Sequence, residues 1–203
     1  MGLREKAKKD KRNRIREAAR YVFERKGFEA ATTREIAQRA EVAVGTLFVY
    51  APAKRDLLLM VYNDDLETLS AEVNPDAPII EQLTALFRPR FEFWGRNPEL
   101  SRYVVREVFE PIHEDEEKEA ETLRFRRRRT TVMGDVADIV KRSQAAGEID
   151  ANVDPMLVSE LIHGIFLNEN RQWLESSKPD VDEGVSHMRT ILTLALRGSM
   201  TAR

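Results

Sequence analysis

Apolar residues recur with a helical period along nearly the whole chain. Between residues 11 and 26 they lie at positions i, i+3, i+4, i+7 and i+8, and this stripe consists of Ile15, Ala18, Ala19, Val22 and Phe23. Such a stripe is typical of a helix that buries one face. The same period predicts further helices over 32–40, 44–50, 53–73, 79–96, 98–109, 116–146, 155–176 and 181–197. Because no stretch alternates convincingly with period two, the sequence predicts an all-α fold.

Residues with known effects on helix ends mark some of these boundaries. Gly27 is placed to end the first helix, because glycine readily adopts the backbone conformation that follows a helix. Thr32 and Glu35 have the spacing of a capping box, in which each side chain accepts a hydrogen bond from the backbone of the other. Pro89 lies inside the 79–96 pattern, and its ring and missing N–H should kink or split that helix.

The predicted helices over 32–40 and 44–50 are short and are joined by a three-residue turn. After an amphipathic helix, this is the spacing of a helix-turn-helix. Small residues would let the two helices cross closely and apolar residues would hold the crossing; the candidates are Ala37, Ala40 and Gly45, then Ile36, Val42 and Leu47. On the exposed face of the second helix, Thr46, Phe48 and Tyr50 can reach bases or phosphates. The simpler alternative is a compact three-helix knot inside a bundle.

Charge is distributed unevenly between the two ends of the chain. Residues 1–60 contain 15 Lys and Arg but only 8 Asp and Glu, a net charge of +7, whereas the remaining residues carry −9. A basic end is expected where a protein meets a polyanion such as DNA, so the charge favours the helix-turn-helix over the knot. The 203 residues include no cysteine, which excludes disulfides, thiolate nucleophiles and cysteine-ligated metals.

The amino-terminal quarter of the chain resembles the DNA-binding domain of TetR-family transcriptional regulators. The resemblance rests on Ile15, Ala18, Ala19, Phe23, Gly27, Phe28, Thr32, Ile36, Ala37, Ala40, Val42, Gly45, Thr46, Leu47, Phe48, Lys54, Leu57 and Leu58. It implies a homodimer that places two recognition helices in successive major grooves of a palindromic, double-stranded DNA operator. It also implies repression that is relieved by a small hydrophobic or amphipathic effector.

The resemblance further implies a division of the chain and a set of DNA-binding residues. Residues 1–54 would form a basic arm and a three-helix DNA-binding domain, with the motif at about 32–51. Residues 55–203 would form a larger helical bundle for effector binding and dimerisation. Lys54 stands at the position of the family's usual phosphate-binding lysine. The implied DNA-binding residues are Thr32, Thr33, Arg34, Ala43, Val44, Thr46, Leu47, Phe48, Tyr50 and Lys54.

Four positions depart from the family's pattern. Glu41 replaces a glycine of the turn, Ala43 replaces a Ser or Thr cap, Phe48 replaces a tyrosine, and Ala51 replaces an aromatic residue. We expect a strained turn, a recognition helix that lacks a cap contribution of about 1 kcal/mol, and weaker phosphate anchoring. A basic arm can offset this loss by contacting the DNA backbone or minor groove, unless it is a solvated tail. The arm consists of Arg4, Lys6, Lys8, Lys9, Lys11, Arg12, Arg14 and Arg16.

The implied effector site and dimer interface lie after the DNA-binding domain. Candidates for the effector site are mostly aromatic residues that could equally be plain core: Phe91, Trp94, Tyr103, Phe109, Phe125, His163, Phe166 and Asn170. The dimer interface would use apolar residues of the last two helices, which could instead be buried within the same chain: Leu157, Leu161, Ile165, Val185, Met188 and Leu192. Only the resemblance favours the dimer.

Two Glu-x-x-His pairs offer an alternative function. Glu110–His113 and Glu160–His163 have the spacing found in di-iron helical bundles, but Pro111 interrupts the first pair and no bridging glutamates are evident. A helical metalloenzyme therefore stays an alternative, as does a protein–protein adaptor whose basic end binds an acidic partner. The prediction is a cytoplasmic DNA-binding regulator without enzymatic activity, cofactor or metal. It has no membrane segment, since its apolar runs are far shorter than the roughly 20 residues that a bilayer requires.

Overall fold

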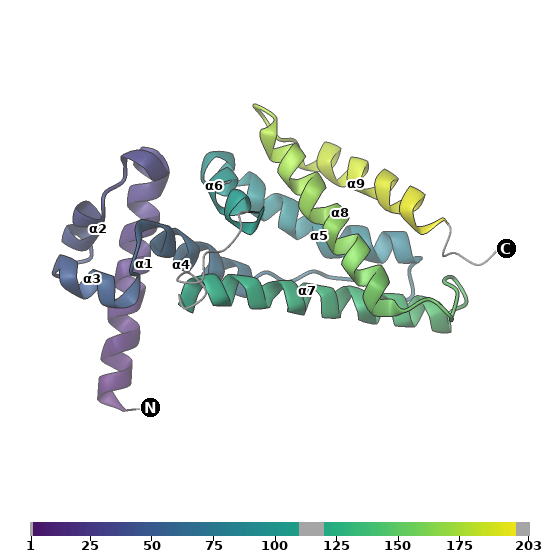
Figure 1. Cartoon of the computed structure of the whole chain (residues 1–203), viewed down its shortest axis with the longest axis horizontal. Coiled ribbons are helices and arrows are strands. Elements are labelled where there is room, and N and C mark those ends of the chain that lie inside the picture. The colour runs from purple at the N-terminus through teal and green to yellow at the C-terminus, as the bar shows by residue number, and fades with distance from the viewer. Residues whose placement is uncertain (1, 110–119, 198–203) are drawn as a thin grey trace. The chain divides into compact units, whose positions relative to one another are not determined.

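The computed structural model describes residues 2–109 and 120–197, which form nine helices and no strand (Figure 1). The all-α prediction is therefore confirmed for this part of the chain. The helices belong to two compact units. One, the head unit, comprises Met1–Thr68 and Glu99–Arg126, and the other, the body unit, comprises Leu69–Pro98 and Arg127–Arg203. None of the described helices combines the length and the apolar character needed to cross a membrane.

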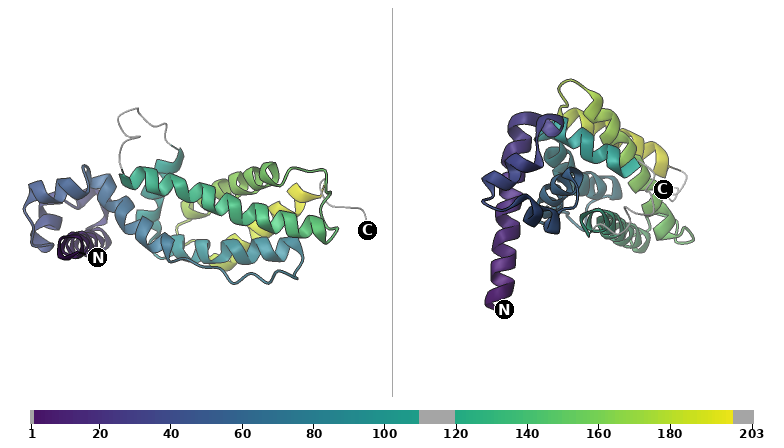
Figure 2. Two further views of the ribbon diagram at one scale, coloured as in Figure 1. Left: turned by 90° about the horizontal axis from the view of Figure 1, so that it is seen from below. Right: turned by 60° about the vertical axis from the view of Figure 1, so that its left-hand side comes forward.

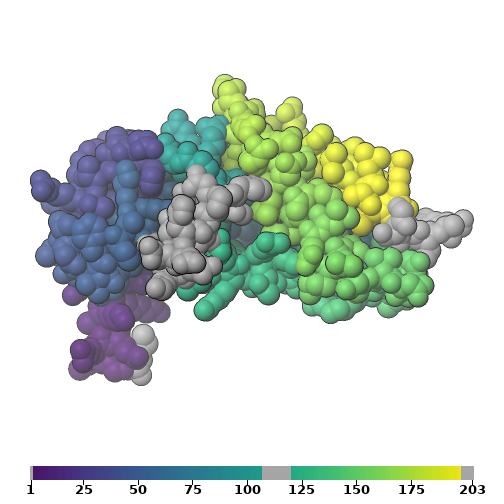
Figure 3. Space-filling model, in the orientation of Figure 1, coloured from purple at the N-terminus to yellow at the C-terminus, as the bar shows by residue number. Residues whose placement is uncertain are grey.

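Helix α1 (Leu3–Ala30) is the longest helix of the head unit. The predicted apolar stripe is confirmed, because all five of its residues are buried. The helix begins earlier than the pattern predicts, and its first turns extend beyond α2, α3 and α4 (Figure 2) and project into solvent (Figure 3). At Gly27 the backbone φ is 74°, so the helical geometry breaks where the sequence predicts an end, and one more turn follows the break.

The other elements of the head unit pack around α1. They are α2 (Thr33–Arg39), α3 (Val44–Tyr50), α4 (Lys54–Glu67), α6 (Pro98–Phe109) and the start of α7 (Ala120–Ala145). Helix α1 packs against α2 and α4, and α2 packs against α3. Helix α4 ends at Glu67 instead of continuing to residue 73. The first residues of the 116–146 pattern lie outside the described part of the chain.

The body unit is built on α5 (Ile79–Gly95), most of α7, α8 (Pro155–Glu175) and α9 (Val181–Leu196). Helices α5, α8 and α9 pack against one another (Figure 1). Pro89 was predicted to kink or split the 79–96 helix; the split is wrong, since α5 continues through it, and the kink stays a prediction. Proline withholds one N–H from the helix, and next to it the Arg90 guanidinium donates a hydrogen bond to the Leu86 carbonyl.

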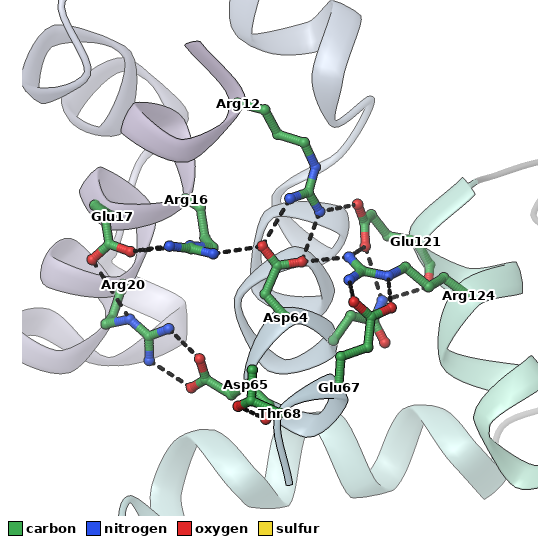
Figure 4. Close-up of polar contacts among 11 residues, drawn as sticks. Arg12, Arg16, Glu17, Arg20, Asp64, Asp65, Glu67, Thr68, Glu121 and Arg124 are labelled. Carbon is green, nitrogen blue, oxygen red and sulfur yellow. Dashed lines mark hydrogen bonds and ion pairs between the residues drawn. The ribbon is translucent and has the colours of Figure 1, made fainter. Parts of the chain in front are cut away.

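A cluster of ion pairs joins three helices of the head unit (Figure 4). Asp64 of α4 accepts hydrogen bonds from Arg12 at 2.8 Å and Arg16 at 2.7 Å, both on α1, and from Arg124 of α7. Arg12 also donates to Glu121 of α7 at 2.8 Å. The side chain of Asp64 is only 11% exposed, and the three guanidinium groups hold the pKa of its carboxyl well below the usual range. We call these five residues the Asp64 cluster.

The Asp64 cluster contains two residues of the predicted basic arm. Arg12 and Arg16 were predicted to contact DNA as part of that arm, but the structure uses both in ion pairs within the head unit. Arg14 lies 3.6 Å from Glu41, an exposed acidic residue. The exposed cations at the start of α1 are therefore Arg4, Lys6, Lys8 and Lys9.

We expect Asp64→Asn to lower the free energy of unfolding by about 2–4 kcal/mol, because it leaves three partly buried arginines without their shared carboxylate. Asp65→Asn is the matched control on the same helix. Within the described part of the chain Asp65 forms an ion pair with Arg20 alone, and both side chains are 27% exposed, so its loss should cost at most about 1 kcal/mol. Urea denaturation at neutral pH measures both values. Equal effects of the two substitutions would contradict the central role of Asp64.

Candidate nucleic-acid interface

Helices α2 and α3 form the predicted helix-turn-helix. Ile36 and Leu47 are fully buried at their crossing, and Ala37 lies beside them. The capping box is confirmed at the start of α2. The hydroxyl of Thr32 accepts a hydrogen bond from the backbone N–H of Glu35 at 3.2 Å, and the Glu35 carboxylate accepts one from the N–H of Thr32 at 3.3 Å. Local sequence signals thus place α2 well.

The turn and the start of α3 lack such favourable signals. Glu41 has a φ of 54°, which makes it the one non-glycine residue with a positive φ among residues 2–109 and 120–197. This left-handed conformation is costly for a residue with a Cβ, so the expected strain at this position is confirmed. Ala43 precedes α3 without any side-chain hydrogen bond to the helix, which confirms the missing cap. Tertiary packing, above all the burial of Leu47, therefore holds α3 in place.

The predicted DNA-binding residues of α3 differ in how far their side chains are exposed to solvent. Val44 and Phe48 are exposed, Thr46 and Tyr50 are partly exposed, and Leu47 has no exposed surface at all. Leu47 therefore positions the helix and cannot reach a ligand outside it. Gly45 also differs from its predicted role at the helix crossing, because it is exposed and a Cβ there would meet nothing within 4 Å.

Val49, absent from the predicted set, is the most exposed residue of the helix, at 81%. The signal that would have found it is helical spacing, since Val49 follows the predicted core residue Leu47 by two positions and so lies on the opposite side of the helix.

Lys54 lies at the start of α4 and is bound within the head unit. Its ammonium group donates to the backbone carbonyls of Phe28 at 2.8 Å, Glu29 at 3.1 Å and Ala31 at 3.3 Å. It also lies 4.5 Å from the centre of the Phe28 ring, within the range of a cation–π interaction. These carbonyls end α1 and have no partner within the helix, so Lys54 caps α1 and ties α4 to it.

The predicted effector residues do not all belong to one unit. Phe91, Trp94, His163, Phe166 and Asn170 are buried in the body unit. The others belong to the head unit. There the ring of Tyr103 lies 4.9 Å from that of Phe28, Phe125 is half-buried, and the side chain of Phe109 lies outside the described residues.

Within the body unit, two buried polar groups on α8 lack hydrogen-bond partners. They are Nδ1 of His163 and Oδ1 of Asn170. Burial, together with the nearby cations Arg129 and Arg90, lowers the pKa of His163 to about 4, so the imidazole is neutral at pH 7. Burial also lowers the pKa of Arg90. Polar groups in a protein interior are normally satisfied, so these two atoms, like the buried hydroxyl oxygen of Ser143 on α7, depart from the usual pattern.

A cluster of aromatic rings includes Phe166, whose ring centre lies 6.4 Å from that of His163. Phe166 stacks on Phe87 with ring centres 4.6 Å apart, and meets Phe91 edge-to-face at 5.9 Å. The ring of Trp173 lies 5.1 Å from that of Phe91. Gly184 of α9 packs against the same rings, and a Cβ there would lie 2.8 Å from Trp173. The packing around Phe166 is therefore apolar and close, and the Arg90 guanidinium lies 5.7 Å from the centre of the Phe87 ring.

The Glu-x-x-His pairs give little support to a metal site. Glu160 is exposed whereas His163 is buried, and Glu110 and His113 lie outside the described residues. The described residues contain no group of three or more His, Asp or Glu side chains suited to a metal ion.

The predicted dimer residues also divide by burial. Leu157 and Leu161 of α8 are 63% and 49% exposed, and Ile165 is half-buried. The three residues predicted on α9, Val185, Met188 and Leu192, are buried within the body unit. They belong to the core of the same chain, which was the alternative reading of the sequence. Met156 and Leu194 are exposed apolar residues outside the predicted set.

Both the helix-turn-helix segment and the whole chain are similar to known proteins. Residues 15–61 match the family described as bacterial regulatory proteins, tetR family. The HTH-type transcriptional repressor KstR of Mycolicibacterium smegmatis is 36% identical over 72 residues, which cover 36% of this chain and 35% of that protein. KstR of Rhodococcus jostii is 27% identical over 189 residues, which cover 88% of this chain and 81% of that protein.

The fold is also shared with a solved structure. Thermus thermophilus FadR, a TetR-family transcriptional repressor in complex with lauroyl-CoA, superposes with a TM-score of 0.69 and 23% identity. The match covers 95% of this chain and 96% of that chain.

We expect Glu41→Gly to raise the free energy of unfolding by about 1 kcal/mol, because glycine adopts a positive φ without steric cost. Glu41→Ala is the control, since it removes the same charge and the same contact with Arg14 but keeps a Cβ. Urea denaturation of both variants separates the backbone effect from the charge effect. If alanine stabilised the protein as much as glycine, the strain at this turn would be disproved.

Proposed function

Residues 15–61 match the tetR family of bacterial regulatory proteins, and from this premise we propose that the chain is a ligand-responsive transcriptional repressor of that family. It binds a palindromic DNA operator as a dimer and is released by a small amphipathic effector. The observation that carries the proposal is the α2–α3 helix-turn-helix, which lies in the segment that matches the family. Its site of action is the cytoplasm, where the chromosome of a bacterium lies.

DNA contacts in this proposal come from three parts of the head unit. The exposed face of α3 enters the major groove, and the exposed Arg34 of α2 binds a phosphate beside it, with Thr32 and Thr33 at the start of the same helix. The cations at the start of α1 bind the backbone or the minor groove on either side. Because Lys54 already binds three carbonyls, its phosphate contact is an added role, and a Lys54 substitution would also disturb the head unit.

The dimer in this proposal is formed by a second copy of the chain on the exposed apolar side chains of α8 and α9. Leu157, Leu161 and Leu194, with Met156 nearby in sequence, expose apolar surface that a twofold axis would bury. A dimer places two copies of α3 about 34 Å apart, the length of one turn of DNA, and therefore requires a palindromic operator.

The proposed effector has an apolar chain and a polar or anionic head. Support comes from the buried ring cluster of the body unit and from the two unpaired polar atoms of His163 and Asn170 with Arg90 and Arg129 close by. Further support comes from the FadR structure, which holds lauroyl-CoA on the same fold. We therefore propose an acyl thioester or a related amphipathic acid as the ligand class.

Selection of bound duplexes from a random pool tests the DNA-binding proposal. We expect a palindrome with half-sites about 10 base pairs apart, centre to centre. Lys8→Ala should weaken binding similarly on all duplexes and lower the salt dependence by about one phosphate contact. Lys178→Ala, which changes an exposed lysine of the body unit, should leave both unchanged. A folded protein with no affinity for DNA at low salt would instead favour the adaptor that binds an acidic protein.

Lauroyl-CoA tests the effector proposal. It should release the protein from its operator duplex, whereas coenzyme A alone should have a much smaller effect. Asn170→Leu should weaken this response about fivefold or more by removing a hydrogen bond to the ligand, while the ligand-free protein becomes about 1 kcal/mol more stable because a buried unsatisfied group is lost. Asn168→Leu, an exposed position on the same helix, is the control for both measurements. Lower stability of the ligand-free Asn170→Leu protein would contradict the proposed role of Asn170.

A further inference from the structure

We propose that α3 identifies its operator through the 5-methyl groups of thymine, which Val44, Phe48 and Val49 contact in the major groove. This inference rests on the proposed DNA-binding function and specifies the chemistry by which the sequence is read. It follows from three observations: the residue types of α3, the face that α3 exposes, and the glycine at position 45.

The residue types of α3 exclude the usual hydrogen-bond readout of bases. Guanine is typically read by Arg or Lys, adenine by Asn or Gln, and cytosine by Asp or Glu. The seven residues from Val44 to Tyr50 include none of these six types. The side-chain donors and acceptors of the helix are the hydroxyls of Thr46 and Tyr50, and both side chains are only partly exposed. Base recognition by this helix must therefore depend mainly on apolar contacts.

The exposed face of α3 is apolar. Val44, Gly45, Phe48 and Val49 are spaced i, i+1, i+4 and i+5, so they form one continuous face opposite the buried Leu47. Val49 is 81% exposed, Phe48 is 42% exposed and Val44 is 36% exposed. The thymine methyl is the apolar group that a base pair presents in the major groove, and an apolar side chain is its natural partner.

Charge complementarity identifies DNA as the occupant of this face. The face itself carries no charge, but it lies on a segment with a net charge of +7 over residues 1–60. Arg34 of α2 and the cations at the start of α1 are exposed on the same head unit. Cations that bind phosphates would bring an uncharged reading surface against the bases, whereas an apolar protein partner would have no need of them.

Gly45 supplies an independent observation. Its φ is not positive, and a Cβ at this position would meet nothing within 4 Å, so nothing within the head unit requires a glycine. Glycine inside a helix is destabilising relative to alanine, because it loses more conformational freedom on folding. We infer that the missing side chain lets the backbone of α3 approach the edges of the bases and brings the neighbouring Val44 and Val49 within reach of the methyl groups.

The test replaces thymine by deoxyuridine in the duplex that the selection enriches. Deoxyuridine lacks the 5-methyl group but keeps every hydrogen-bonding group of thymine. We expect binding to weaken about fourfold for each contacted thymine, because burial of one methyl group contributes ~0.8 kcal/mol. Deoxyuridine placed outside the half-sites is the matched DNA control and should have no effect.

Protein variants assign the effect to α3. Val49→Ser should weaken binding to the thymine duplex and abolish much of the deoxyuridine effect, because the partner of the methyl is then absent. Lys8→Ala should weaken binding to both duplexes by the same factor. Gly45→Ala should keep or raise the stability of the free protein while it weakens specific binding about tenfold or more.

The outcomes separate the two proposals. Deoxyuridine effects that are confined to the half-sites and lost in Val49→Ser would support thymine readout. An enriched palindrome that binds equally well with deoxyuridine, or that keeps its full deoxyuridine effect in both Val49→Ser and Val44→Ser, would overturn it and leave the proposed function intact. Failure of the folded protein to enrich any duplex would overturn both.

Discussion

The carboxylate of Asp64 draws arginines from two other helices to one point of α4, and the arrangement of the head unit depends on it. A carboxylate this little exposed needs compensating charge, and Arg12, Arg16 and Arg124 supply it. Near the opposite end of α4, the Lys54 ammonium binds the carbonyls that end α1. Helix α4 is therefore fixed to α1 by polar contacts at both ends, with buried apolar side chains between them. Since α2 packs on α1, these contacts also set the frame on which α3 is displayed.

The recognition helix is held by this frame more than by its own local sequence. Its turn contains Glu41 at a positive φ, and it begins at Ala43 without a side-chain cap. Burial of Leu47 offsets both disadvantages, and it leaves the opposite face of α3 free to be apolar and exposed. The basic side chains of the head unit also differ in what they do. The arginines of the Asp64 cluster stabilise the head unit, while the lysines at the start of α1 stay in solvent.

On α8 of the body unit, by contrast, two buried polar atoms have no hydrogen-bond partner among the described residues. His163 and Asn170 lie on the buried face of α8, and burial, with nearby cations, lowers the pKa of His163 and keeps the imidazole neutral. Enclosed polar atoms without partners reduce the stability of a ligand-free protein, and the proposed effector would supply the missing hydrogen bonds. Gly184 of α9 packs closely against Trp173 in the same region. The proposal of an effector with an apolar chain and a hydrogen-bonding group rests on this ring cluster and on these unpaired atoms.

Sequence patterns alone determined the helices, the helix-turn-helix and the buried stripe of α1, because periodicity and capping are local properties. The departures from the pattern of the family that the sequence resembles also located the strained turn at Glu41 and the uncapped start of α3. The assignments that failed depend on residues far apart in the chain: Arg12 meets Asp64 and Glu121, which are 52 and 109 positions away. For the same reason only tertiary packing could show that Lys54 caps α1, that Leu47 and three apolar residues of α9 are core, and that Gly45 and Val49 face outward. A residue's type and period limit what it can contact, but its actual partners are set by how the helices pack.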